Sequence, residues 1–93
     1  MNPADKPVRW TLHALDRVGN QNLDEDAARL TILDPEYVVA GTDARRIYMR
    51  RYTEPQTGPP MLIRAVVEET PTERIVVTVY VTSKIAKYLK GVT

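Results

Sequence analysis

The sequence predicts an α+β fold, with two N-terminal helices, a meander of three or four antiparallel strands and a C-terminal helix. Two features of the sequence support this class. Apolar residues recur at helical spacing before Pro35, whereas after it they follow the period of two that is typical of strands. Short turns rich in proline and glycine separate the later segments, as in antiparallel hairpins.

Length and composition indicate one globular domain. The chain has 93 residues, of which 43% are hydrophobic and 27% are charged. We assign residues 1–8 to an extended lead-in and residues 9–93 to a single domain. The chain has no cysteine, so it holds no disulfide and no thiolate metal site. Its apolar runs are the length of a strand and its first residues lack the apolar core of a signal peptide, which predicts a cytoplasmic protein without a membrane segment.

Two helices are predicted before Pro35. The first covers residues 10–18 and ends at a Gly-Asn pair. The second follows Asn22, which forms a variant of the capping box with Glu25, and it ends near residue 33. It stops there because the residue before a proline avoids the helical region.

Four strands and a last helix are predicted after Pro35. The predicted strands are residues 37–40, 45–52, 61–69 and 75–81. The helix follows residue 83 and has Ile85, Tyr88 and Leu89 at helical spacing. Helices should cover the sheet face that holds Ile47, Met49, Ile63, Ala65, Val67, Val77 and Val79. The uncovered face should then hold Tyr48, Arg50, Arg64, Thr78 and Tyr80.

The segment of residues 45–52, Arg-Arg-Ile-Tyr-Met-Arg-Arg-Tyr, is the most distinctive in the chain. Read as a strand, it places Arg46, Tyr48, Arg50 and Tyr52 on one face. Guanidinium groups beside aromatic rings are suited to RNA or another polyanion. The same pattern is also that of an ordinary solvated sheet face, and the sequence leaves both interpretations open.

Charge is divided unevenly along the chain. Residues 1–44 carry four cations and eight anions, giving −4, whereas residues 45–93 carry nine cations and four anions, giving +5. The electric field of this charge distribution steers a polyanion toward the half of the chain formed by residues 45–93. The total of +1 predicts weak non-specific affinity for nucleic acid at physiological salt.

Two motifs resemble a family of small bacterial domains of unknown function. They are His-Ala-x-x-Arg at residues 13–17 and Thr-Val-Tyr-x-Thr-Ser-Lys at residues 78–84. That family is similar to the RelE and BrnT toxins in its layout of helices followed by a sheet. The resemblance spans about residues 10–90, and it implies the fold first and nuclease activity by analogy. Members often have an arginine and a glycine before the second helix, where this chain has Gln21 and Asn22.

A toxin of this type cleaves RNA without a metal, which requires a base, a cation beside the phosphate and an acid. The candidate catalytic residues are His13, Arg17, Arg64 and Tyr80. His13 is the only histidine, and imidazole is the usual side chain for proton transfer near neutral pH, while Arg17 lies one helical turn further on the same face. Each residue also has a structural interpretation, such as a hydrogen-bonded histidine at a helix start or an ion pair between Arg64 and Glu68.

Two functions are therefore left open. The first is a non-catalytic binding module whose basic sheet face contacts RNA or an acidic, antitoxin-like protein through Arg46, Tyr48, Arg50, Lys84 and Lys87. The alternative is a metal-independent endoribonuclease of RelE/BrnT type. We expect no cofactor and no metal centre, because one histidine and scattered acids form no ligand cluster. Residues 37–40 are a candidate edge strand and homodimer seam.

Overall fold

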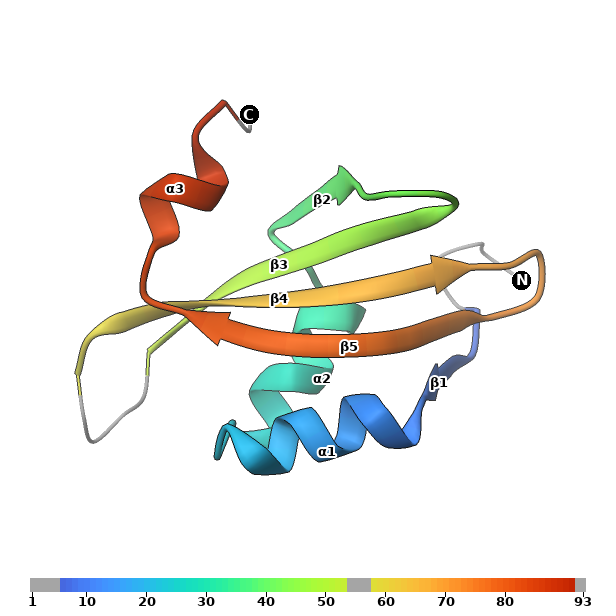
Figure 1. Ribbon diagram of the computed structural model, residues 1–93, viewed down its shortest axis with the longest axis horizontal. Coiled ribbons are helices and arrows are strands. Elements are labelled where there is room, and N and C mark those ends of the chain that lie inside the picture. The colour runs from blue at the N-terminus through green and yellow to red at the C-terminus, as the bar shows by residue number, and fades with distance from the viewer. Residues whose placement is uncertain (1–5, 54–57, 92–93) are drawn as a thin grey trace.

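A five-stranded sheet forms the centre of the protein, and helices lie on both of its faces (Figure 1). The computed structural model describes residues 6–53 and 58–91. The elements are β1 (Val8–Trp10), α1 (Leu12–Asn20), α2 (Glu25–Leu33), β2 (Tyr37–Ala40), β3 (Arg45–Thr53), β4 (Pro60–Glu69), β5 (Arg74–Thr82) and α3 (Ile85–Leu89). The α+β class is confirmed. Half of the predicted loop of residues 53–60, namely residues 54–57, lies outside the described residues.

The sheet is mixed, with strand order β1-β5-β4-β3-β2. The three pairs from β2 to β5 are antiparallel, but β1 pairs with β5 in parallel, Val8 beside Arg74 and Trp10 beside Val76. The predicted helix start at Trp10 is therefore wrong, because Trp10 belongs to a strand. Of the predicted extended lead-in, residues 1–5 lie outside the described residues. A strand of three residues is too short to show a period, and its partner is far away in the sequence.

Side-chain caps decide where the first two helices begin. The Thr11 hydroxyl accepts a hydrogen bond from the backbone N–H of Ala14 at 3.1 Å, and the Asp24 carboxylate accepts one from Ala27 at 2.9 Å. The predicted capping box at Asn22 is wrong. Asn22 has a φ of 53°, in the left-handed region, and belongs to the turn between the helices.

The main core lies between the sheet and the helices α1 and α2. Its buried residues are Ala14, Val18, Leu23, Ala28, Ile32, Tyr48, Ile63, Ala65, Val67, Val76 and Val79. A register shift between Val66 and Val67 lets both Val76 and Val79 face the helices, although they are three residues apart. Val77 was predicted on this face, but it lines a groove on the other face together with Thr78.

Strand β3 has the opposite orientation to the predicted one. Tyr48 pairs with Ala65, and Met49 pairs with Arg64. Because paired residues share a face, Tyr48 faces the main core with Ala65, and Met49 faces the other way. Because side chains alternate along a strand, Arg46 and Arg50 point to the same face as Tyr48, and Ile47 points to the same face as Met49.

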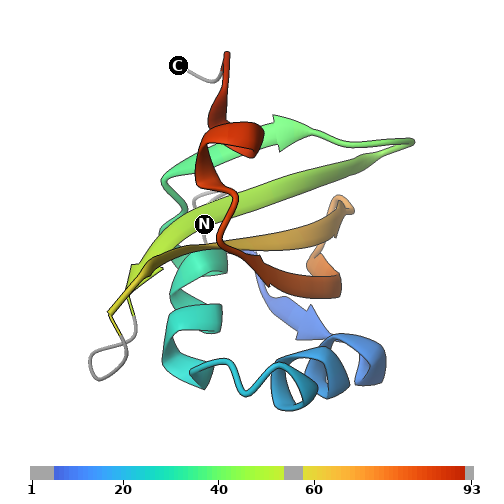
Figure 2. The same cartoon turned by 60° about the vertical axis from the view of Figure 1, so that its left-hand side comes forward.

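The reason for this error is that apolar residues are buried on both faces of the sheet. Helix α3 lies on the face opposite α1 and α2, not beside them as predicted (Figures 1 and 2). Met49 and Leu62 point to the α3 face, and both are 0% exposed. Apolar residues are thus needed on both sides of β3, so its alternation does not indicate which side faces the larger core.

Helix α1 closes one edge of the sheet. Strand β1 pairs with β5 only as far as Val76, so on this edge no strand of the described residues lies beside the later part of β5. There the Gln21 side chain donates a hydrogen bond to the Val79 carbonyl at 2.9 Å and accepts one from the Val81 N–H at 2.9 Å. Its carboxamide therefore takes the place of one residue of a neighbouring strand. It gives hydrogen-bond partners to backbone groups that could otherwise pair with a strand of another molecule.

Replacing Gln21 by alanine should lower the free energy of unfolding by about 1–3 kcal/mol, because two partly buried backbone groups lose their partner. The matched control is Asn20→Ala on the exposed side of the same helix, which should change stability by less than about 0.5 kcal/mol. Urea unfolding monitored by circular dichroism measures both. Equal midpoints for the two variants would show that Gln21 does not hold the edge.

Candidate functional site

One arginine and two tyrosines form a cluster on the sheet face that α3 covers. Arg64 lies in the middle of β4, and Tyr80 is its partner on β5. The guanidinium carbon lies 5.2 Å from the ring centre of Tyr80 and 4.0 Å from that of Tyr88 on α3. The two rings meet edge to face, with centres 6.5 Å apart. We call Arg64, Tyr80 and Tyr88 the Arg64 cluster.

The charge of Arg64 has no acidic partner among the described residues. Its Nε lies 3.4 Å from the Met49 sulfur, and none of the ion pairs within the described residues includes it. The predicted pair with Glu68 does not form. Burial lowers the pKa of Arg64, while the Tyr88 hydroxyl acts in the opposite direction. A guanidinium remains protonated at neutral pH, so the cluster holds a partly buried, uncompensated positive charge.

Lysines of the α3 segment extend this charge into solvent. Lys87 Nζ lies 5.3 Å from the ring centre of Tyr88, and both Lys84 and Lys87 are exposed. The structure therefore brings together Arg64, Tyr80 and Lys87, all predicted as site residues. Tyr88 was predicted only as a packing residue of the last helix. The available signal was a ring beside a lysine on that helix, but its contact with Arg64 depends on tertiary structure.

The candidate catalytic group is not assembled. His13 and Arg17 are both exposed on α1. That helix lies on the opposite side of the sheet from α3, whereas Arg64 and Tyr80 point toward α3 (Figure 2). The sheet itself separates the two pairs, so they cannot act on one phosphate in this arrangement.

The predicted ladder of Arg46, Tyr48 and Arg50 on an uncovered face is wrong. Tyr48 is only 5% exposed, in the main core. Arg50 donates a hydrogen bond to the backbone carbonyl of Asp34 at 2.6 Å and pairs with its carboxylate at 3.5 Å. Arg46 is exposed, but it lies on the face of the sheet that packs against α1 and α2, which we call the helix side, and the Arg64 cluster lies on the other face.

A second polar cluster surrounds Glu69 on the helix side. Its carboxylate accepts hydrogen bonds from the Tyr48 hydroxyl, from Lys6 Nζ at 3.0 Å and from Arg74 Nε at 3.3 Å. Burial and the neighbouring Glu69 raise the pKa of Tyr48 to about 12. Burial opposes ionisation of Glu69, but the hydrogen bonds from Tyr48 and Lys6 and the charges of Arg74 and Lys6 lower its pKa overall. Because its groups satisfy one another, this cluster ties residue 6 to the β4–β5 hairpin and is structural.

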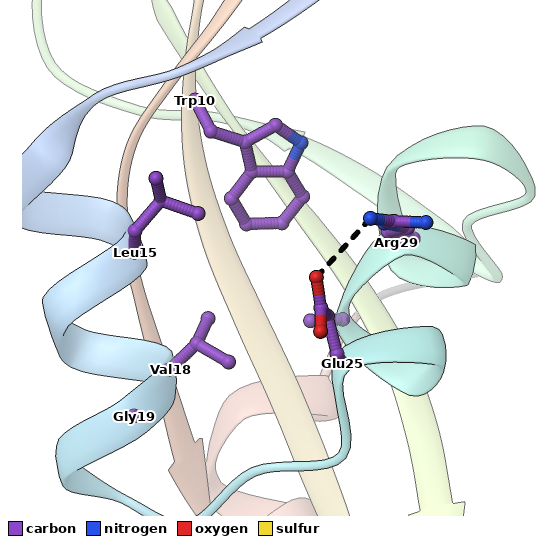
Figure 3. A pocket seen from close by; sticks show the side chains of 7 residues that line it. Trp10, Leu15, Val18, Gly19, Glu25 and Arg29 are labelled. Carbon is purple, nitrogen blue, oxygen red and sulfur yellow. Dashed lines mark hydrogen bonds and ion pairs between the residues drawn. The ribbon is translucent and has the colours of Figure 1, made fainter.

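A cavity of about 280 Å³ lies between α1 and α2 (Figure 3). The Trp10 ring lies on one side of it, and the ion pair of Glu25 with Arg29, 3.1 Å long, lies on another. The remaining lining residues are Leu15, Val18, Gly19 and Ala28. The two charges neutralise each other and the other residues are apolar or lack a side chain, so the cavity offers no reactive group.

No set of three or more histidine, aspartate or glutamate side chains in the described part of the chain is placed to hold a metal ion. None of the helices formed by residues 6–53 and 58–91 is long and apolar enough to cross a membrane. No family model, curated protein or solved structure matches this chain. Function must therefore be inferred from the site itself.

The protein should lose stability as the pH rises from about 10 to about 12. The pKa of Tyr48 is raised from 10.0 to about 12 in the folded state, so its contribution is complete below pH 10 and disappears as the pH passes through 12. Tyr48→Phe should remove this part of the decline and lower stability at neutral pH by about 0.5–2 kcal/mol.

Urea unfolding at stepwise pH measures this effect, with Tyr37→Phe on the opposite sheet face as the control that keeps the wild-type decline. An unchanged alkaline decline in Tyr48→Phe would contradict the assignment to the Tyr48–Glu69 hydrogen bond.

Proposed function

We propose that this protein is a non-catalytic, cytoplasmic RNA-binding module and that the Arg64 cluster is its contact with single-stranded RNA. The observation that supports this most is the unpaired charge of Arg64. Three arginines of the described chain are partly buried, and two of them, Arg50 and Arg74, pair with carboxylates. Arg64 has aromatic rings instead. A partly buried cation that the fold leaves uncompensated is suited to an external anion.

Single-stranded RNA offers both groups that the cluster can bind. Its phosphates are ligands for Arg64 and for the exposed lysines Lys84 and Lys87. Its unstacked bases pack against tyrosine rings such as Tyr80 and Tyr88. An acidic, antitoxin-like protein would satisfy the charges but not use the rings, so RNA is the better match.

The arrangement does not favour the alternative, an endoribonuclease of RelE/BrnT type. His13 and Arg17 lie across the sheet from Arg64 and Tyr80, so no base is available beside a bound phosphate. We propose kinship with the RelE and BrnT toxins at the level of the fold only. It is supported by the two helices that precede the strands from β2 to β5.

Arg64→Gln should weaken binding of a fluorescein-labelled single-stranded RNA by about tenfold or more, measured by fluorescence anisotropy. It should also reduce the slope of log K against log salt by about one, because one phosphate contact is lost. The matched control is Arg29→Gln, which removes the same charge from an exposed arginine on the helix side. Equal losses for both variants would indicate non-specific attraction and contradict the assignment.

Purified protein should leave the same RNA uncut, with or without EDTA, because the candidate catalytic residues are separated by the sheet. His13→Ala should bind this RNA as the wild type does. Gel analysis of the incubated RNA measures cleavage, and anisotropy measures binding. Cleavage by the wild type that His13→Ala abolishes would overturn the non-catalytic part of the proposal.

A further inference from the structure

Strand β2 is the last strand at the edge of the sheet away from β1, and none of the described elements lies beyond it (Figure 1). The Gly41 N–H donates to the Arg45 carbonyl at 2.9 Å, in the register that also pairs Val39 with β3. Hydrogen-bonded and non-bonded pairs alternate along an antiparallel ladder. The backbone groups of Val38 and Ala40 therefore point away from the sheet.

These outward groups have no partner in the described part of the chain. Outside the ladder between β2 and β3, no hydrogen bond of the described residues includes the backbone of Val38 or Ala40. The opposite edge differs, because there Gln21 occupies the corresponding groups of β5. Apart from being short, β2 has none of the features that protect an edge, since it contains neither a charged residue nor a proline.

Exposed apolar side chains lie next to this edge in the sequence. Large hydrophobic residues that are exposed within the described chain include Leu30, Leu33 and Val38, at 41%, 72% and 42%. All three belong to α2 and the start of β2. Val38 pairs with Tyr48 and so points to the face that α2 covers. A sheet that continues beyond β2 would cover Val38 on its open side.

We propose that two copies of this chain pair through β2, antiparallel and about a two-fold axis at Val39, to form one continuous sheet. In this register Val38 lies opposite Ala40 of the second copy. The N–H of each of these two residues donates a hydrogen bond to the carbonyl of the other, which gives partners to the backbone groups that point outward in the monomer. The axis is perpendicular to the sheet, so α1 and α2 of both copies lie on one face and α3 of both on the other.

The edge is complementary to itself, which favours a second copy over another extended partner. Tyr37 lies opposite Gly41 of the second copy, and Glu36 lies opposite Thr42, so no like charges meet across the seam. Gly41 also borders a groove of about 590 Å³ on the α3 face, whose apolar lining includes Ile47. Tyr37 points to that same face, so its ring can cover the glycine and enter the groove.

Sedimentation equilibrium of the full chain over a range of concentrations tests the proposal. The wild type should form a dimer. Val38→Lys should raise the dimer dissociation constant by at least about tenfold, because symmetry places the new charge on both sides of the seam. The matched control, Leu12→Lys, makes the same substitution at an apolar residue that is 81% exposed on α1, and it should leave the dimer intact.

Amide hydrogen exchange measured by NMR distinguishes a lost seam from a damaged fold. In the wild-type dimer the amides of Val38 and Ala40 should be protected and should lose protection on dilution, whereas that of Val39 stays protected by β3. A wild type that remains monomeric, a dimer that Val38→Lys does not weaken, or a dimer with unprotected Val38 and Ala40 amides would each overturn the proposal.

Discussion

The register of β4 between β3 and β5 is the constraint on which the rest of the structure depends. Ala65 is fully buried between Tyr48 and Val79, which directs all three to the main core. The neighbouring residue, Arg64, must then point to the other face. A shift of the register by one residue would exchange the two faces, placing a charge in the larger core and alanine beneath α3. The core and the candidate site thus depend on the same ladder of hydrogen bonds.

Charge compensation differs between the two faces of the sheet. On the helix side, Arg50 and Arg74 have carboxylate partners, and Glu69 accepts hydrogen bonds from three side chains. On the α3 side, Arg64 is held by aromatic rings, which attract a cation without neutralising it. Stability alone would favour a paired or an apolar residue at this position. A locally unfavourable choice of this kind is what a binding site is expected to show.

The two edges of the sheet also differ in how their backbone N–H and carbonyl groups find hydrogen-bond partners. Where β1 ends, Gln21 supplies a donor and an acceptor in place of a strand, so the chain completes that edge with its own atoms. At β2 the corresponding backbone groups of Val38 and Ala40 point away from the sheet. Backbone polar groups require partners, and this requirement is met within the chain at β5 and, in the dimer that we propose, by a second copy at β2.

Periodicity by itself determined the α+β class and the approximate positions of both long helices and of the four strands after Pro35, because these properties depend on local repeats of apolar residues. Residue chemistry predicted Arg64 and Tyr80 as catalytic residues and Lys84 and Lys87 as binding residues, and the structure brings Arg64, Tyr80 and Lys87 close to Tyr88. Only tertiary structure decided the pairing of β1, the face to which Tyr48 points, the separation of His13 from Arg64 and the contact of Tyr88 with Arg64. Each of these depends on residues distant in sequence. Because apolar residues are buried on both faces of the sheet, a local pattern cannot show to which face a side chain belongs.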